Sequence, residues 1–210
     1  MDVACVLYDN FTMLDIVGPF QMLNAAGHSC HWVAESAGPV TDHTRTMQMT
    51  ATANLDETTE PDIVVVPGGM GTNAHFDGPI PEWLQAVHAR TTWTTSVCTG
   101  SLLLARAGLL DGLTATGHWA AMDALEALGA APTHQRVVMH PDHRIVTAAG
   151  VSAGIDMGLA LVAEIDGRET AEMCQLALEY DPQPITDAGS PEKAGPELVG
   201  AMARFFASNL

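Results

Sequence analysis

The chain has 210 residues, of which 47% are apolar, and a formal net charge of −17 at pH 7 from 25 acidic and 8 basic side chains. This length and apolar content predict one folded domain over residues 1–210 with a full core, and they exclude general disorder. The negative charge repels phosphate backbones and anionic lipid, so nucleic acid and membranes are not expected partners. A small neutral substrate fits this charge best.

The cysteines indicate the compartment. The four of them are scattered, with no CxxC spacing, which argues against a disulfide scaffold and favours a reducing compartment. No basic segment precedes the first apolar run, and no apolar run is long enough to span a bilayer. We therefore expect a cytoplasmic protein.

The first half of the chain alternates between apolar runs typical of strands and helical patterns. The run at 62–66 is apolar at nearly every position, which is typical of a parallel strand covered on both faces. The predicted elements are a strand at 3–8, a helix from Gly18-Pro19 to about 26, a strand at 31–34, an edge hairpin within 41–59 and the central strand at 62–66.

The second half continues the alternation. The predicted elements are helices at 81–90, 99–107 and 118–128, a strand at 94–97, a hairpin of 137–139 with 145–147, a helical region at 152–179 broken near Gly167, an irregular segment at 182–196 and a short final helix. Alternating strands and helices predict an α/β fold with three layers, in which an open, mostly parallel, flavodoxin-like sheet has helices on both faces.

Cys98 stands where the strand at 94–97 passes directly into a helix. A side chain on such a turn, a nucleophile elbow, points outward at the carboxyl end of the sheet, where open α/β folds bind ligands. The helix N-terminus favours an anion there, so we expect Cys98 to be available as a thiolate nucleophile. Cys5 and Cys174 lie in apolar periodic runs and are interpreted as structural.

The Pro67-Gly68-Gly69-Met70-Gly71 turn follows the central strand. Its glycines allow backbone N–H groups to approach a ligand closely, so Gly69 and Met70 are candidates for a pocket that stabilises negative charge. A nucleotide phosphate loop is the competing interpretation. It is disfavoured because the spacing is neither GxGxxG nor GxxxxGK[ST].

Asp15 is an acid among apolar residues. It is either the N-cap of a helix that begins at Gly18, or a group facing Cys98. In the second case burial and a neighbouring thiolate would raise its pKa, and it could act as a general acid or base.

Together these segments resemble the ThiJ/PfpI superfamily, over nearly the whole chain from Val3 to about Pro191. Within it the chain is similar to the isonitrile hydratase branch, which carries Asp at the position of Asp15 and Thr directly after the nucleophile, as at Thr99. The matching segments are Leu14-Asp15-x-x-Gly18-Pro19, Val64 to Gly69, Val97 to Ser101, Ala107 to Gly112, Ala115 to Trp119, Ala153 to Asp156, Leu178 to Pro182 and Ala188 to Pro191.

The resemblance implies hydration of an isonitrile to an N-substituted formamide, with no metal or organic cofactor, by a homodimer. It implies Cys98 as nucleophile, Asp15 as acid and base, and Thr99 as an ordering residue. The implied pocket consists of Gly69, Met70, Val151, His118 and Trp119. The chain departs from its relatives at Gly117, where they usually carry Thr.

Two other functions stay open. A glyoxalase- or deglycase-like enzyme acting on reactive carbonyls would use the same nucleophile, and a non-enzymatic sensor would use Cys98 as an oxidisable thiol. The proteases of the superfamily carry His after the nucleophile, where this chain has Thr99. Its AraC-type regulators carry a basic DNA-binding module, which the acidic balance of this sequence does not lead us to expect. The pairs His28/His31 and His140/His143 have metal-like spacing but no third ligand nearby, so no metal is expected.

Overall fold

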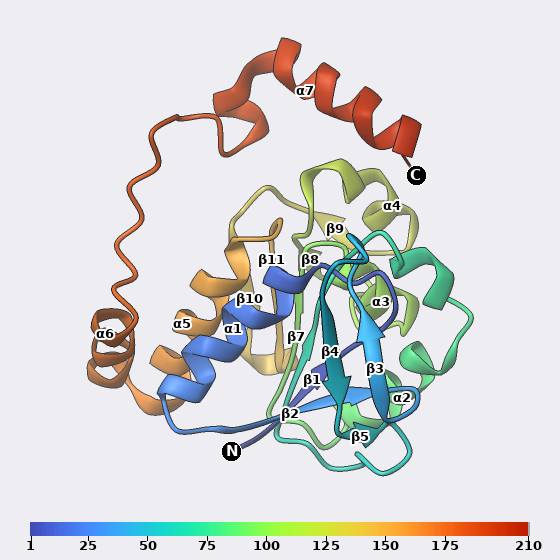
Figure 1. Ribbon diagram of the computed structural model, residues 1–210, viewed down its shortest axis with the longest axis vertical. Coiled ribbons are helices and arrows are strands. Elements are labelled where there is room, and N and C mark those ends of the chain that lie inside the picture. Colours follow the sequence, from blue (N-terminus) through green and yellow to red (C-terminus); the bar gives the residue numbers. More distant parts are fainter. Residues whose placement is uncertain (210) are drawn as a thin grey trace.

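The protein is described by a computed structural model over residues 1–209, with side chains up to Phe206, and its centre is one large sheet (Figure 1). Only β10 and β11 pair antiparallel in it; the other neighbouring strands of the described sheet are parallel. The predicted α/β class with a mostly parallel sheet is confirmed. Within residues 1–209 this sheet has seven strands, in the order β10 (Val137–His140), β11 (Ile145–Ala148), β7 (Trp93–Val97), β6 (Ile63–Val66), β1 (Asp2–Val6), β2 (Ser29–Ala34) and β5 (Ala53–Asn54).

Helices cover both faces of the sheet (Figure 1). One face carries α1 (Met13–Ala25) packed on α5 (Ala153–Asp166), with α6 (Arg168–Ala177) beside them. The other carries α2 (Pro79–His88), α3 (Gly100–Arg106) and α4 (Met122–Ala127). The described 3-10 turns are η1 (Thr72–His75), η2 (Trp119–Ala121) and η3 (Pro141–His143). Because helices lie on both sides, β6 is buried along its whole length, as its continuous apolar run predicts.

Two small sheets flank the main one. The predicted hairpin is formed by β3 (Gly38–Thr41) and β4 (Gln48–Ala51). The hairpin begins slightly earlier than expected, and it forms a sheet separate from the main one. The second small sheet pairs β8 (Thr114–Ala115) with β9 (Ala131–Pro132). The predicted hairpin of β10 and β11 and the helix break at Gly167 are confirmed.

The predicted start of the first helix at Gly18 is wrong, because α1 begins at Met13 and contains Pro19. The Gly-Pro pair is used for close packing against α5 rather than as a helix start. A Cβ atom added at Gly18 would lie 3.0 Å from Cγ1 of Ile155, and one added at Gly154 would lie 3.0 Å from Cδ of Pro19. Asp15 therefore lies inside the first turn of α1 and is not the N-cap, which is Thr12.

Two later boundaries also differ from prediction. The helix expected at 118–128 divides into η2 and α4. The final helix, α7 (Pro191–Asn209), begins before the predicted end of the irregular segment and breaks at Gly195, whose φ is 77°. Figure 1 shows the connection from α6 running along the outside of the molecule to α7, which lies over α4.

The parallel strands bring four loops together. The segments after β1, β6, β7 and β11 leave neighbouring strands at the same edge of the sheet, as the parallel pairing requires. They carry Asp15, Gly68, Cys98 and Val151 respectively. In residues 1–209 no helix is long and apolar enough to cross a membrane.

Candidate active site

Cys98 occupies the turn between β7 and α3 with a left-handed backbone. Its φ is 60°, which is uncommon outside glycine and costs roughly 1 kcal/mol or more. The backbone N–H of Cys98 holds this turn by donating to the carbonyls of Ala148 and Ala149, at 3.1 and 3.0 Å. The Cys98 side chain is only 5% exposed, so its sulfur lies in a largely dry environment.

Asp15 reaches the same place from α1. Its side chain is fully buried, and Oδ2 accepts a hydrogen bond of 2.8 Å from the N–H of Gly68. Oδ1 has no hydrogen-bond partner of ordinary geometry in the described chain, although the carboxyl group interacts with the Cys98 thiol. One carboxyl oxygen is thus fixed by the glycine loop, and the other is left for the thiol or a ligand.

Burial is the largest influence on the pKa values of Asp15 and Cys98. Burial raises the pKa of Asp15 from its ordinary 3.8 to about 7, while the hydrogen bonds from Gly68 and the Cys98 thiol act in the opposite direction. Burial, and then the Asp15 charge, raise the pKa of the Cys98 thiol well above its usual range. The site therefore favours a thiol beside Asp15, and not the resting thiolate expected from the helix N-terminus.

Two backbone N–H groups, those of Val151 and Thr99, hydrogen-bond to the Cys98 sulfur and lower its pKa against these effects. Val151 has a φ of 26°, a genuine outlier for a β-branched residue. The strain is consistent with a turn shaped to aim this N–H group at the sulfur. These donors would stabilise negative charge on sulfur during a reaction.

The Thr99 hydroxyl binds the glycine loop rather than the sulfur. Its Oγ1 accepts from the N–H of Gly69 at 2.9 Å and lies 2.8 Å from Oγ1 of Thr72. Thr72 in turn contacts the hydroxyl of Tyr8 at 3.1 Å. A Cβ atom at Gly68 would lie 2.5 Å from the Thr99 nitrogen, so only glycine allows the loop to come this close.

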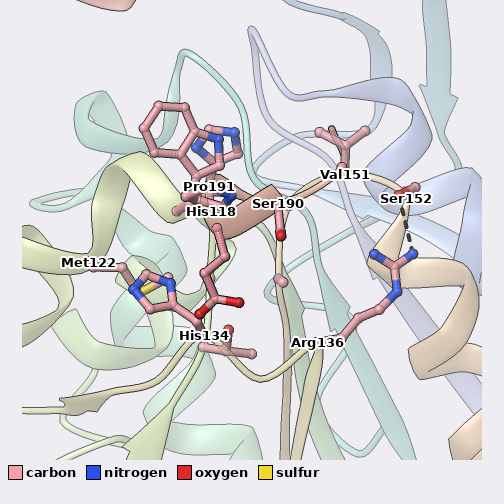
Figure 2. Close-up of a pocket in the computed structure, with 15 residues that line it drawn as sticks. His118, Met122, His134, Arg136, Val151, Ser152, Ser190 and Pro191 are labelled. Atoms are coloured by element: carbon pink, nitrogen blue, oxygen red, sulfur yellow. Dashed lines mark hydrogen bonds between the residues drawn. The ribbon is translucent and has the colours of Figure 1, made fainter. Parts of the chain in front are cut away.

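A pocket of about 490 Å³, drawn in Figure 2, lies next to this site through Val151; neither Cys98 nor Asp15 lines it. Val151, whose N–H binds the sulfur, is in its wall, together with His118 and Trp119. Burial lowers the pKa of His118, and its Nδ1 accepts from the N–H of Ala120 at 3.3 Å. The other lining residues are Thr116, Gly117, Met122, His134, Arg136, Ala149, Gly150, Ser152, Gly189, Ser190, Pro191 and Glu192.

Part of the predicted site falls elsewhere. Met70 is 42% exposed and does not line this pocket. The N–H of Gly69 is used by Thr99, so it is not a free donor for a ligand. Within residues 1–209, no three side chains of His, Cys, Asp or Glu lie close enough to hold a metal ion.

Four further residues at or beside the site were not predicted from the sequence. Thr72, Tyr8, Arg136 and Glu192 stand in segments with no motif of their own, and only the fold brings them here. The sequence did point to the region of Gly68, because this residue belongs to the glycine turn that follows the central strand.

A mostly parallel α/β sheet, with a cysteine on the turn after one central strand and a carboxyl group beside it, defines the class of this protein. Residues 1–164 match the DJ-1/PfpI family, and the chain belongs to that family. The resemblance to the ThiJ/PfpI superfamily is confirmed.

Three relatives show the range of the similarity. The chain is 37% identical to the isonitrile hydratase of Pseudomonas putida over 212 residues, which covers 100% of this chain and 92% of that protein. It is 31% identical to the HTH-type transcriptional regulator GbdR of Pseudomonas aeruginosa, over 80% of this chain but only 47% of the regulator. A ThiJ/PfpI family protein from Pseudomonas syringae superposes with a TM-score of 0.92 at 38% identity, over 99% of this chain and 86% of that one.

Proposed function

We propose that this protein hydrates isonitriles to N-substituted formamides, with Cys98 as the nucleophile and Asp15 as the acid and base. The observation that carries the proposal is the Asp15 carboxyl group held beside the Cys98 thiol in a buried site. The full-length similarity to an isonitrile hydratase supports it.

In the first step the sulfur of Cys98 attacks the terminal carbon of R–N≡C and forms a carbon–sulfur bond. Asp15, as a carboxylate, takes the thiol proton and delivers it to the same carbon. The product of this step is a thioimidate, R–N=CH–S–Cys98. A carboxyl group with a pKa of about 7 is suited to both transfers near neutral pH.

In the second step water attacks the thioimidate carbon, and Asp15 takes a proton from this water and delivers it to the nitrogen, which gives R–NH–CH(OH)–S–Cys98; the proton of the new hydroxyl group is the one that later returns to the sulfur. The carbon–sulfur bond then breaks, the sulfur regains its proton, and R–NH–CHO leaves. One water molecule is added overall. The N–H groups of Val151 and Thr99 stabilise the sulfur as it departs, and the Thr99 hydroxyl positions the glycine loop.

The test is turnover of para-nitrophenyl isocyanide, followed as formamide, by the wild type and by Cys98→Ala. Cys174→Ala is the matched control, because Cys174 is also buried but lies in α6, outside the site. We expect formamide from the wild type and the control and none from Cys98→Ala. Full turnover by Cys98→Ala would refute the scheme.

The same preparations separate the two alternatives. Turnover of methylglyoxal without turnover of isonitriles would favour the carbonyl enzyme. Selective oxidation of Cys98 by peroxide, with no turnover of either substrate, would favour the redox sensor.

The remaining expectations stay predictions of this proposal. They are a single domain over residues 1–210, a homodimer, a cytoplasmic location, and a reaction that needs no metal or organic cofactor.

A further inference from the structure

The C-terminal segment supplies one wall of the pocket beside Cys98. Ser190 and Pro191, at the start of α7, face the same cavity as Val151 and Arg136 (Figure 2). The far end of α7 is anchored there too, since the ring of Phe206 lies 5.5 Å from that of His118 and 5.9 Å from that of Trp119. The segment is therefore held at the pocket by both its first turn and its aromatic end.

One of the residues that line the pocket has a polar group without a hydrogen-bond partner within residues 1–209. Thr116 is fully buried and lines the cavity, and its Oγ1 has no hydrogen-bond partner in the described chain. Buried hydroxyl groups are nearly always satisfied, by protein, water or ligand. The wall of this pocket therefore includes an unused hydroxyl group.

The positive charge in the pocket is compensated. Nε of Arg136 lies 2.5 Å from Oδ2 of Asp156, and Nη2 of Arg136 donates to Oγ of Ser152 at 3.2 Å. The other oxygen of Asp156 accepts from the hydroxyl of Tyr180 at 2.9 Å. The nearby Lys193 is paired with Asp187 at 2.6 Å. Neither cation is thus free to attract an anionic ligand.

Glu192 is the acidic side chain of the pocket wall, and it has no ion-pair partner among the described residues. His134 and Arg136 are the other titratable groups of the wall besides His118. With a chain charge of −17 behind it, Glu192 makes the local field negative.

We propose that this pocket binds the substituent R of the isonitrile, and that Glu192 makes it select neutral or cationic substituents over anionic ones. The statement about R rests on the proposed function. The charge selection rests on the position of the pocket next to Cys98, since Val151 lines the pocket and its N–H binds the sulfur. A pocket of about 490 Å³ has the size of ordinary small-molecule sites, so a substituent as large as an aromatic ring fits.

The first test does not depend on isonitriles. Cys98 is alkylated with iodoacetamide, which is neutral, and with iodoacetate, which is anionic, at pH about 8, and modification of Cys98 is measured by peptide mass spectrometry. The variant is Glu192→Gln, and the matched control is Glu197→Gln, also on α7 but outside the pocket wall. Alkylation of glutathione, a free thiol, by the same two reagents gives the ratio of their intrinsic rates.

We expect the wild type to prefer iodoacetamide more strongly than glutathione does. Glu192→Gln should reduce that excess preference about threefold to tenfold at low salt, and ~1 M NaCl should reduce it in the wild type. Glu197→Gln should match the wild type. Equal ratios in the wild type and Glu192→Gln would overturn the inference, whether or not any isonitrile is a substrate.

The second test uses methyl isocyanoacetate and the isocyanoacetate anion as a matched pair of substrates. Glu192→Gln should raise the ratio of kcat/KM for the anion to kcat/KM for the ester about threefold to tenfold, through KM for the anion. If both substrates are turned over and Glu192→Gln does not change the ratio of their kcat/KM values, the charge selection is wrong and the proposed function stands. No turnover of either, with altered alkylation ratios, would remove the function and keep the charge selection.

Discussion

The hydroxyl oxygens of Thr72 and Thr99 lie 2.8 Å apart and connect the turn after β6 to the residue that follows Cys98. Thr72 also donates to the carbonyl of Gly69 at 2.8 Å, and Tyr8 donates to the carbonyl of Pro67 at the same distance. The Thr99 hydroxyl also donates to the carbonyl of Gly69, at 3.3 Å, so either threonine can supply the hydrogen between their two oxygens. The loop that carries Asp15's partner Gly68 is thereby fixed to the Cys98 turn.

Removing one hydroxyl group from this network should slow the reaction. For Thr72→Val we expect kcat to fall by about tenfold, since a lost buried hydrogen bond costs roughly 1–3 kcal/mol, with little change in KM. Thr72→Ser should restore most of the rate. The control is Thr91→Val, which removes a buried hydroxyl bonded to Thr94 at 2.9 Å by the amino end of β7. If both valine variants lost kcat equally, Thr72 would be structural only.

Asp15→Asn keeps the shape of the side chain and removes its proton. We expect kcat/KM for an isonitrile to fall about 10²- to 10⁴-fold, the usual contribution of a general acid or base. In the wild type kcat/KM should rise as the pH increases through about 7 and then level off, because Asp15 must lose a proton before it can accept one from the thiol. Undiminished turnover by the variant would remove Asp15 from the chemistry.

The same substitution should change how stability depends on pH. Between about pH 4 and pH 7 the folded protein keeps a proton on Asp15 that the unfolded chain has released, so the free energy of unfolding falls as pH rises through this window. At roughly 1.4 kcal/mol for each pKa unit, the loss is on the order of 4 kcal/mol and levels off above pH 7.

Urea denaturation of the wild type and Asp15→Asn at pH about 5 and about 8 measures this effect. The variant should gain stability relative to the wild type between the two pH values. Asp123→Asn, an exposed position in α4, should show no such gain. A constant difference at both pH values would mean that Asp15 titrates normally.

Gly117 should not accept a side chain. A Cβ atom there would lie 2.4 Å from Oγ of Ser101 and 2.8 Å from the carbonyl oxygen of Cys98, to which Ser101 donates at 3.1 Å. We expect Gly117→Ala to lower the free energy of unfolding by about 1–3 kcal/mol and to slow turnover by moving Cys98. Adding Ser101→Ala should restore part of both losses.

The control for this experiment is Gly200→Ala on α7, where the nearest atom, on the flexible Arg204 side chain, would lie at 3.5 Å. It should leave turnover unchanged. Additive losses in the Gly117→Ala, Ser101→Ala double variant would show that the two residues are not coupled.

The sequence by itself determined the fold class and the position of Cys98, because both follow from local patterns. Continuous apolarity at β6, the alternation of strands with helices, and a cysteine between a strand and a helix are each legible within a few residues. The order of several such segments was enough to indicate the family.

Only the tertiary structure decided what surrounds the sulfur. Pro19 lies inside α1 because packing against α5 overrides its local preference, and that placement carries Asp15 into the core. The pKa values of Asp15 and Cys98 then follow from burial, a property of the whole fold. Glu192 lines the pocket because α7 returns to it from the far end of the chain, and no local pattern of residues encodes such a long-range contact.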